Sequence, residues 1–151
     1  MVRSLSLVAV LILVVALIAP AAAVPGDRYS YLTVNEVVVT LERGDAYIRV
    51  NYTIDEGARV ILLLLGTQDI KGKILKILNF EDAELRSIDT TSAEVFVPDI
   101  SYNYGRGVFW FPEHSFNIVI PHLTIITPQT SREFWVTSAF PEGMGYFAGD
   151  N

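Results

Sequence analysis

The chain has 151 residues, a net charge of −6 and no cysteine. This length suits one domain, which must be stabilised by packing alone because no disulfide can form. Duplex binding needs clustered basic residues, and the three lysines all fall between Lys71 and Lys76, so the composition argues against a nucleic-acid partner.

Residues 1–23 are predicted to form a signal peptide. Arg3 is followed by an uncharged apolar stretch from Leu5 to Ala19, and Ala21–Ala23 then supplies the small residues that signal peptidases accept. We predict cleavage after Ala23, which leaves residues 24–151 as a single domain that is secreted or held at the cell surface. The alternative is an uncleaved N-terminal anchor, which would be the chain's only contact with the membrane.

A β-hairpin is predicted over residues 31–54. Residues 46–54 alternate between apolar and polar, as in a half-buried strand. In residues 31–41 the parity of the apolar positions changes at Asn35, which predicts a β-bulge, and Gly44 is suited to the turn between the strands. Asn51 begins the sequon Asn-Tyr-Thr and falls on the solvent side of its strand, so it is a possible glycosylation site.

The next two segments differ in their periodicity. The run RVILLLLG, residues 59–66, is continuously apolar and of strand length, which predicts a central strand covered on both faces. In residues 69–79 the apolar positions share one helical stripe, and this spacing predicts a single amphipathic helix.

The rest of the chain returns to short strands. They are predicted at residues 85–89, 93–97, 108–111, 116–120, 123–127 and 133–140, with prolines at their ends. Short strands at this spacing with one helix predict a mainly β fold, an antiparallel two-layer β-sandwich that is immunoglobulin-like in outline.

The sequence also resembles a group of known proteins. A signal, the hairpin sequence LTVNEVVVTLERGDAYIRVNYTID, an apolar strand and a helix follow one another as in small secreted proteins of archaea, methanogens in particular. The resemblance implies export and a β-domain, and it implies no activity.

Groups with catalytic or metal-binding potential are sparse. His114 and His122 would bind a metal from neighbouring strands only if a carboxylate joined them, and the spacings typical of zinc sites are absent. Ser115 follows His114 without the Gly-x-Ser-x-Gly context of a serine hydrolase. We therefore predict no catalytic residues, no metal and no cofactor.

The densest aromatic segment is SYNYGRGVFWFPEHSF, residues 101–116. Phe109 and Phe111 share one face of a strand and are expected in the core, whereas Trp110 points to the other face. Exposed aromatic rings beside polar groups can stack on a sugar and bind its hydroxyls. The residues that would do so here are Tyr102, Tyr104, Arg106 and Trp110.

Two functions follow as hypotheses. The first is a non-enzymatic, exported β-domain with a structural or interaction role, whose partner would be a surface protein or a glycan. The alternative is a carbohydrate-binding module that uses the aromatic loop at residues 102–111. A third possibility, an exported hydrolase acting through Glu113 and His114, has the least support in the sequence.

Overall fold

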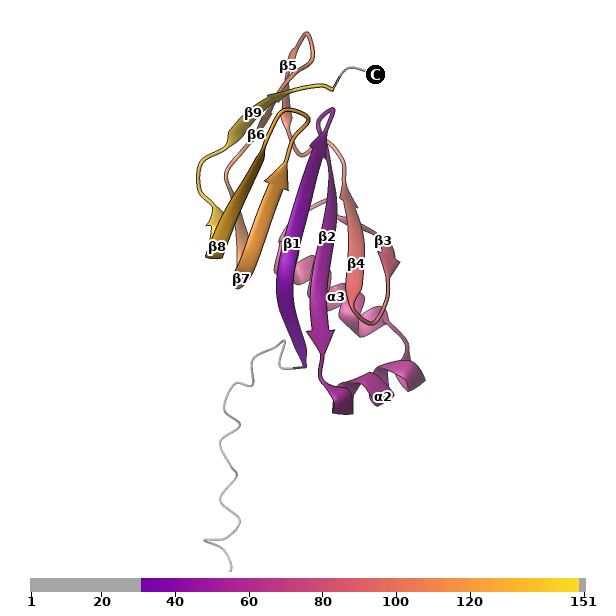
Figure 1. Cartoon of the computed structure of the whole chain (residues 1–151). Helices are drawn as coiled ribbons and strands as arrows, with labels where there is room; N and C mark the ends of the chain where they lie inside the picture. Colours follow the sequence, from indigo (N-terminus) through magenta and orange to yellow (C-terminus); the bar gives the residue numbers. More distant parts are fainter. Residues whose placement is uncertain (1–30, 150–151) are drawn as a thin grey trace, which may run out of the picture. The chain divides into compact units, whose positions relative to one another are not determined.

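The computed structural model describes residues 31–149, with the side chains at 61–63 and 65 excepted. This part of the chain is mainly β, with two sheets and two helices, consistent with a β-sandwich-like fold (Figure 1). The predicted signal peptide and its cleavage site lie outside the described residues. The elements in chain order are β1 (Leu32–Glu42), β2 (Asp45–Ile54), α2 (Glu56–Leu65), α3 (Gln68–Leu78), β3 (Glu84–Ile88), β4 (Ser92–Val97), β5 (Tyr102–Gly105), β6 (Val108–Phe111), β7 (His114–Ile126), β8 (Ser131–Phe140) and β9 (Met144–Phe147).

The hairpin predicted at the start of the domain is confirmed. Strands β1 and β2 pair antiparallel from Leu32 opposite Ile54 to the turn that contains Gly44, whose φ is +98°. The register shifts between Val34 and Glu36, which is the bulge that the change of parity predicts. The bulge keeps the apolar side chains of both halves of β1 on one face of the sheet.

The larger sheet has six strands in the order β3-β4-β2-β1-β7-β8. Its pairs are antiparallel except one, because β1 and β7 run parallel from Glu36 opposite His122 to Thr40 opposite Ile126. The prediction of a wholly antiparallel fold is therefore wrong at the centre of this sheet. Parallel neighbours need a long crossover rather than a tight turn, and here the crossover includes both helices and β2 to β6.

Strand β7 is longer than predicted, since it replaces two short strands and continues through Pro121. A proline cannot donate to a strand ladder. The pairing of β7 with β1 begins only at His122, so the missing donor of Pro121 disrupts no hydrogen bond on that side.

The smaller sheet has three strands in the order β5-β6-β9. Only β6 was predicted, because β5 and β9 have four residues each and carry glycines that hide the strand pattern. The small sheet is tied to the turn of the first hairpin by Tyr146. Its hydroxyl donates to Ser101 Oγ at 2.9 Å and accepts the backbone N–H of Gly44 at 3.2 Å.

The amphipathic helix predicted at residues 69–79 is confirmed as α3. Its apolar stripe is buried and packs towards β7 and β3, and α3 passes behind β1, β2 and β4 in Figure 1. Asn79 ends the helix in the left-handed conformation, with φ +60°, and its N–H donates to the carbonyl of Leu75.

The strand predicted at residues 59–66 is wrong, since residues 56–65 form helix α2. A continuous apolar run has no periodicity that separates strand from helix. Four consecutive leucines favour a helix, Glu56 lies in its first turn, and Gly66 follows it with φ +85°. No helix among residues 31–149 is both long and apolar enough to cross a membrane.

The inner face of the six-stranded sheet forms the core together with α3 and the small sheet. The side chains of this face alternate along each strand with exposed or half-buried ones, as a two-faced sheet requires. Phe109 and Phe111, predicted as core residues, are buried, and Phe111 stacks on Phe140. The fold thereby leaves the opposite face of the large sheet without a covering layer from the described residues.

Candidate functional site

The candidate site is the face of the six-stranded sheet that points away from the core, which we call the outer face. Its side chains come from all six strands and stand opposite one another in register, so that they form rows across the sheet. The outer face consists of Glu36, Val38, Thr40, Tyr47, Arg49, Asn51, Arg86, Glu94, Phe96, His122, Thr124, Glu133 and Trp135.

One row joins an amide, a carboxylate, an imidazole and an indole. Asn51 Nδ2 donates to Glu36 Oε2 at 2.8 Å, and the other oxygen of Glu36 lies 3.1 Å from His122 Nδ1. The ring of His122 stacks on Trp135, with centroids 4.1 Å apart and planes 10° apart. The indole is 68% exposed, so its free side faces solvent in a fixed orientation.

A second row carries a close ion pair. Arg49 Nη2 lies 2.7 Å from Glu94 Oε1, on neighbouring strands β2 and β4. The hydrogen bond from Arg49, with a second from the hydroxyl of Ser87, lowers the pKa of Glu94. The carboxylate is therefore ionised at neutral pH and its charge is balanced within the site.

A third row is aromatic. Tyr47 and Phe96 lie 5.3 Å apart, centroid to centroid, and the guanidinium of Arg86 covers the ring of Phe96 at 4.7 Å. Arg86 also pairs with Glu84 at 3.1 Å. Tyr47 is 51% exposed, which leaves part of its ring and its hydroxyl open to solvent.

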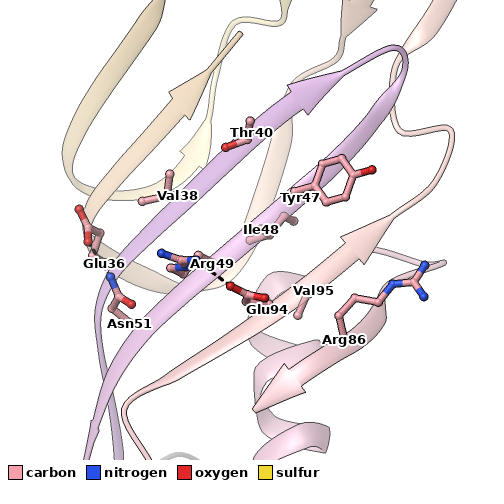
Figure 2. A pocket seen from close by; sticks show the side chains of 10 residues that line it. All are labelled: Glu36, Val38, Thr40, Tyr47, Ile48, Arg49, Asn51, Arg86, Glu94 and Val95. Atoms are coloured by element: carbon pink, nitrogen blue, oxygen red, sulfur yellow. Dashed lines mark hydrogen bonds and ion pairs between the residues drawn. The ribbon is translucent and has the colours of Figure 1, made fainter. Parts of the chain in front are cut away.

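A groove of about 480 Å³ runs over β1, β2 and β4 between these rows (Figure 2). Figure 2 shows the Arg49–Glu94 pair at its centre, Glu36 with Asn51 at one side, and Tyr47 towards the other. The two arginines and two glutamates of its lining balance to zero charge, and each has a partner. The groove therefore offers many hydrogen-bonding atoms and ring surface, but no net charge.

The aromatic residues predicted as a sugar platform lie elsewhere, on the small sheet. Tyr102 and Trp110 are opposite each other on β5 and β6, while Tyr104 and Arg106 lie near the tip of this hairpin. Both tyrosines are exposed. Within residues 31–149, these four side chains share no ring stacking, hydrogen bond or ion pair with one another, so the hairpin brings them near without fixing them.

Trp110 is the most constrained of the four. Its indole is 41% exposed and lies over Gly143, just before β9, and Gly145, within β9. It borders a second cavity, of about 690 Å³, together with Glu113 and Arg132. Trp110 thus does point away from Phe109 and Phe111, as predicted, but one side of its ring is used in packing.

The two histidines lie on one strand, β7, rather than on neighbouring strands. His114 Nε2 lies 2.7 Å from the carbonyl of Leu78, and because a carbonyl only accepts, this nitrogen carries the proton. His114 also stacks on Phe80. Burial lowers its pKa, which the hydrogen bond opposes. In the described part of the chain, no cluster of three or more His, Asp or Glu side chains could hold a metal.

Asn51 lies on the outer face, on the solvent side of its strand as predicted. It is half-buried in β2 between β1 and β4, and its amide nitrogen is engaged by Glu36. A glycan attached here would occupy the groove, so modification and ligand binding would exclude each other.

The sequence contains a signal for this face that a search for clustered aromatic residues misses. The alternation in residues 46–54 places Tyr47, Arg49 and Asn51 on one exposed side, which is a set of groups suited to binding. Trp135 and His122 join them only through the pairing of β1 with β7. That pairing is between segments far apart in the sequence, and no local pattern indicates it.

The chain matches no protein-family model, no curated protein and no solved structure. The function proposed below therefore rests on the residues of the chain itself.

Proposed function

We propose that this protein is an exported, non-enzymatic binding domain that recognises an uncharged oligosaccharide at the cell surface through the outer face. One combination of observations carries this proposal. Every charged side chain in the groove has a partner, and two partly exposed aromatic rings, Tyr47 and Trp135, lie on the same face. A ligand for such a surface needs hydroxyls for the polar groups and a flat apolar side for the rings, and it needs no charge.

The geometry also argues against a charged ligand. An anion would have to displace Glu94 from Arg49, where the N–O distance is 2.7 Å, and a cation would have to displace Arg49 from Glu94. Both side chains of this pair are about half exposed or more, so the pair is weak and screened by water, and a charged ligand would gain little by replacing one member of it. A sugar hydroxyl can instead form hydrogen bonds with the lone pairs of Glu94 and the N–H groups of Arg49 that the pair leaves free, while the pair stays intact.

The experiment is affinity electrophoresis of the full chain in gels that contain neutral polysaccharides, followed by calorimetry with oligosaccharides of the one that retards it. Tyr47→Ala and Trp135→Ala should each weaken binding by about tenfold or more, because aromatic side chains contribute a large share of the energy of a binding face. Both rings are about half or more exposed, so the melting temperature should change little.

Val119→Ala is the matched control, since Val119 is an exposed apolar residue of β7 that is absent from the lining of the groove. Equal loss of binding in this control would point to a general effect of the substitutions. Unchanged binding by both ring variants would refute the outer face as the binding site.

The aromatic hairpin is a second candidate because Tyr102 and Tyr104 are exposed there. Tyr104→Ala in the same gels separates the two surfaces: loss of binding in this variant alone would assign the sugar to the hairpin. A hydrolase acting through Glu113 and His114 is disfavoured because His114 is turned towards Leu78 and Phe80.

Export is supported by the uncharged stretch from Leu5 to Ala19 behind Arg3 and by the small residues Ala21–Ala23. The immunoglobulin-like outline and an archaeal source stay predictions of the sequence. They add nothing to the choice of ligand.

A further inference from the structure

Helix α2 carries an apolar surface that the described residues leave uncovered. From Val60 to Leu65 its sequence is entirely apolar. Val60 is 60% exposed and Leu64 is 80% exposed, and because they are four residues apart they lie on one side of the helix. None of the residues of α2 whose burial is described is buried.

The helix lies next to the point where residues 1–30 join the domain. The N–H of Asp55, the residue before α2, donates to the carbonyl of Tyr31 at 3.0 Å. The 30 residues that precede Tyr31 include the apolar stretch from Leu5 to Ala19. The apolar helix and the apolar N-terminal segment are thus attached at the same end of the β1–β2 hairpin.

Positive charge gathers in the same part of the chain. The two helices, residues 56–78, contain Arg59, the three lysines and two acids, a net charge of +2 in a chain whose net charge is −6. Lys73 Nζ lies 3.2 Å from the centre of the Tyr31 ring and 3.4 Å from Asp69. Lys73 is mostly covered and paired with Asp69, whereas Arg59 on α2 itself and Lys71 and Lys76 on α3 are exposed, so the accessible positive charge of the helices comes from these three residues.

We propose that α2 is a membrane-contact helix that lies in the interface of an anionic lipid bilayer. Apolar side chains with flanking cations and a tyrosine are the combination that such interfaces favour. Ten residues make a helix of about 15 Å, which is too short to span a bilayer of about 30 Å and long enough to lie along its surface.

The positive charge of the two helices favours an anionic lipid surface over the other partners that could cover the apolar side of α2. A second copy of the helix pair would bring like charges together, and the N-terminal segment from Leu5 to Ala19 has no charge to complement them. An anionic lipid surface attracts each basic group by about 1 kcal/mol. This assignment adds a membrane contact beyond the N-terminal segment and does not depend on sugar binding.

The absence of cysteine gives a direct test with the full chain. Leu64→Cys and Val60→Cys variants are spin-labelled and bound to vesicles of equal parts phosphatidylcholine and phosphatidylglycerol. Tyr104→Cys is the matched control, since this exposed residue belongs to the small sheet that is attached at the opposite end of the β1–β2 hairpin. Accessibility to oxygen, which enters lipid, is compared with accessibility to a nickel chelate, which stays in water.

We expect the oxygen-to-nickel ratio to be about tenfold higher at residues 60 and 64 than at residue 104, as for side chains immersed in the interface. On vesicles of phosphatidylcholine alone, the affinity for the vesicles should fall by about fivefold for each exposed basic residue at the surface, and the fraction of labels in lipid should fall with it.

Labels at residues 60 and 64 that stay accessible to nickel on the anionic vesicles would overturn the proposal. So would protection of these labels before lipid is added, which would assign the helix to the chain's own N-terminal segment or to a second copy. Equal immersion on both kinds of vesicle would overturn the choice of anionic lipid. Since no sugar is present, none of these outcomes bears on the proposed glycan site.

Discussion

Trp110 leaves no room for a side chain at Gly143. A Cβ atom on Gly143 would lie 2.5 Å from Cζ2 and 2.6 Å from Cε2 of the indole, well inside contact distance. The Gly143→Ala substitution therefore forces the indole off the segment that leads into β9. We expect it to lower the free energy of unfolding by about 1 to 3 kcal/mol, as overpacking does, and urea denaturation would measure this.

Gly57→Ala is the control for this substitution. A Cβ atom at Gly57 meets nothing within 4 Å, and alanine is the better helix former, so this variant should be neutral or more stable by up to about 1 kcal/mol. When Trp110 is also replaced by alanine, the Gly143→Ala substitution should no longer lower the free energy of unfolding. A cost that persists without the indole would show that the strain lies in the backbone.

The turn between β3 and β4 is organised by one carboxylate. Asp89 Oδ1 accepts the backbone N–H groups of Thr91 at 2.6 Å and of Ser92 at 2.7 Å, and both hydroxyls also donate to the side chain. These hydrogen bonds, the one from Thr91 first, lower the pKa of Asp89 to about 2 from an ordinary 3.8. The turn is thus stabilised by the ionised form.

A carboxyl whose pKa is lower in the folded state stabilises the fold fully above its unfolded value, and this stabilisation is lost as the pH falls towards the folded value. The stability of the wild-type protein should therefore fall between pH 3.8 and pH 2, and Asp89→Asn should reduce that fall. Urea denaturation at the two ends of this range measures it.

Asp82→Asn serves as the control, because its carboxylate lies in an exposed turn and receives no hydrogen bond from the described residues. An equal change of the pH dependence in both variants would show that the effect of Asp89→Asn is not specific to its turn.

The elements that follow a period are the ones that could be predicted. The alternation in β2, the bulge in β1 and the apolar stripe of α3 are local properties, and all three are confirmed. Helix α2 was missed because an unbroken apolar run fits a buried strand and a helix equally well. Strands β5 and β9 were missed because four residues are too few to show a period.

The candidate site could be predicted only in part, for a related reason. The outer-face residues of β2, Asn51 among them, can be recognised from the alternation, and the structure places Asn51 on that face. The row that adds His122 and Trp135 needs the register of β1 with β7 and of β7 with β8. Such registers depend on tertiary packing, and a single sequence gives no information about them.

We expect the mature protein to lack residues 1–23. Native protein purified from its own host should begin at Val24, because Ala21–Ala23 provides the peptidase site. Intact-mass measurement decides this. A mass that retains residues 1–23, in protein that stays with the membrane after an alkaline wash, would show that the N-terminal segment is an anchor, and α2 would then be held at the bilayer permanently.

The parallel pairing of β1 with β7 has a consequence for how the protein is made. The β1–β2 hairpin can form early, but the second neighbour of β1 ends only at Ile126. The contact order is therefore high, and folding should take milliseconds to seconds rather than microseconds. Until β7 has left the ribosome, β1 is an open edge that can pair with other chains. A fragment that ends before His114 should therefore aggregate instead of remaining as half of the sheet.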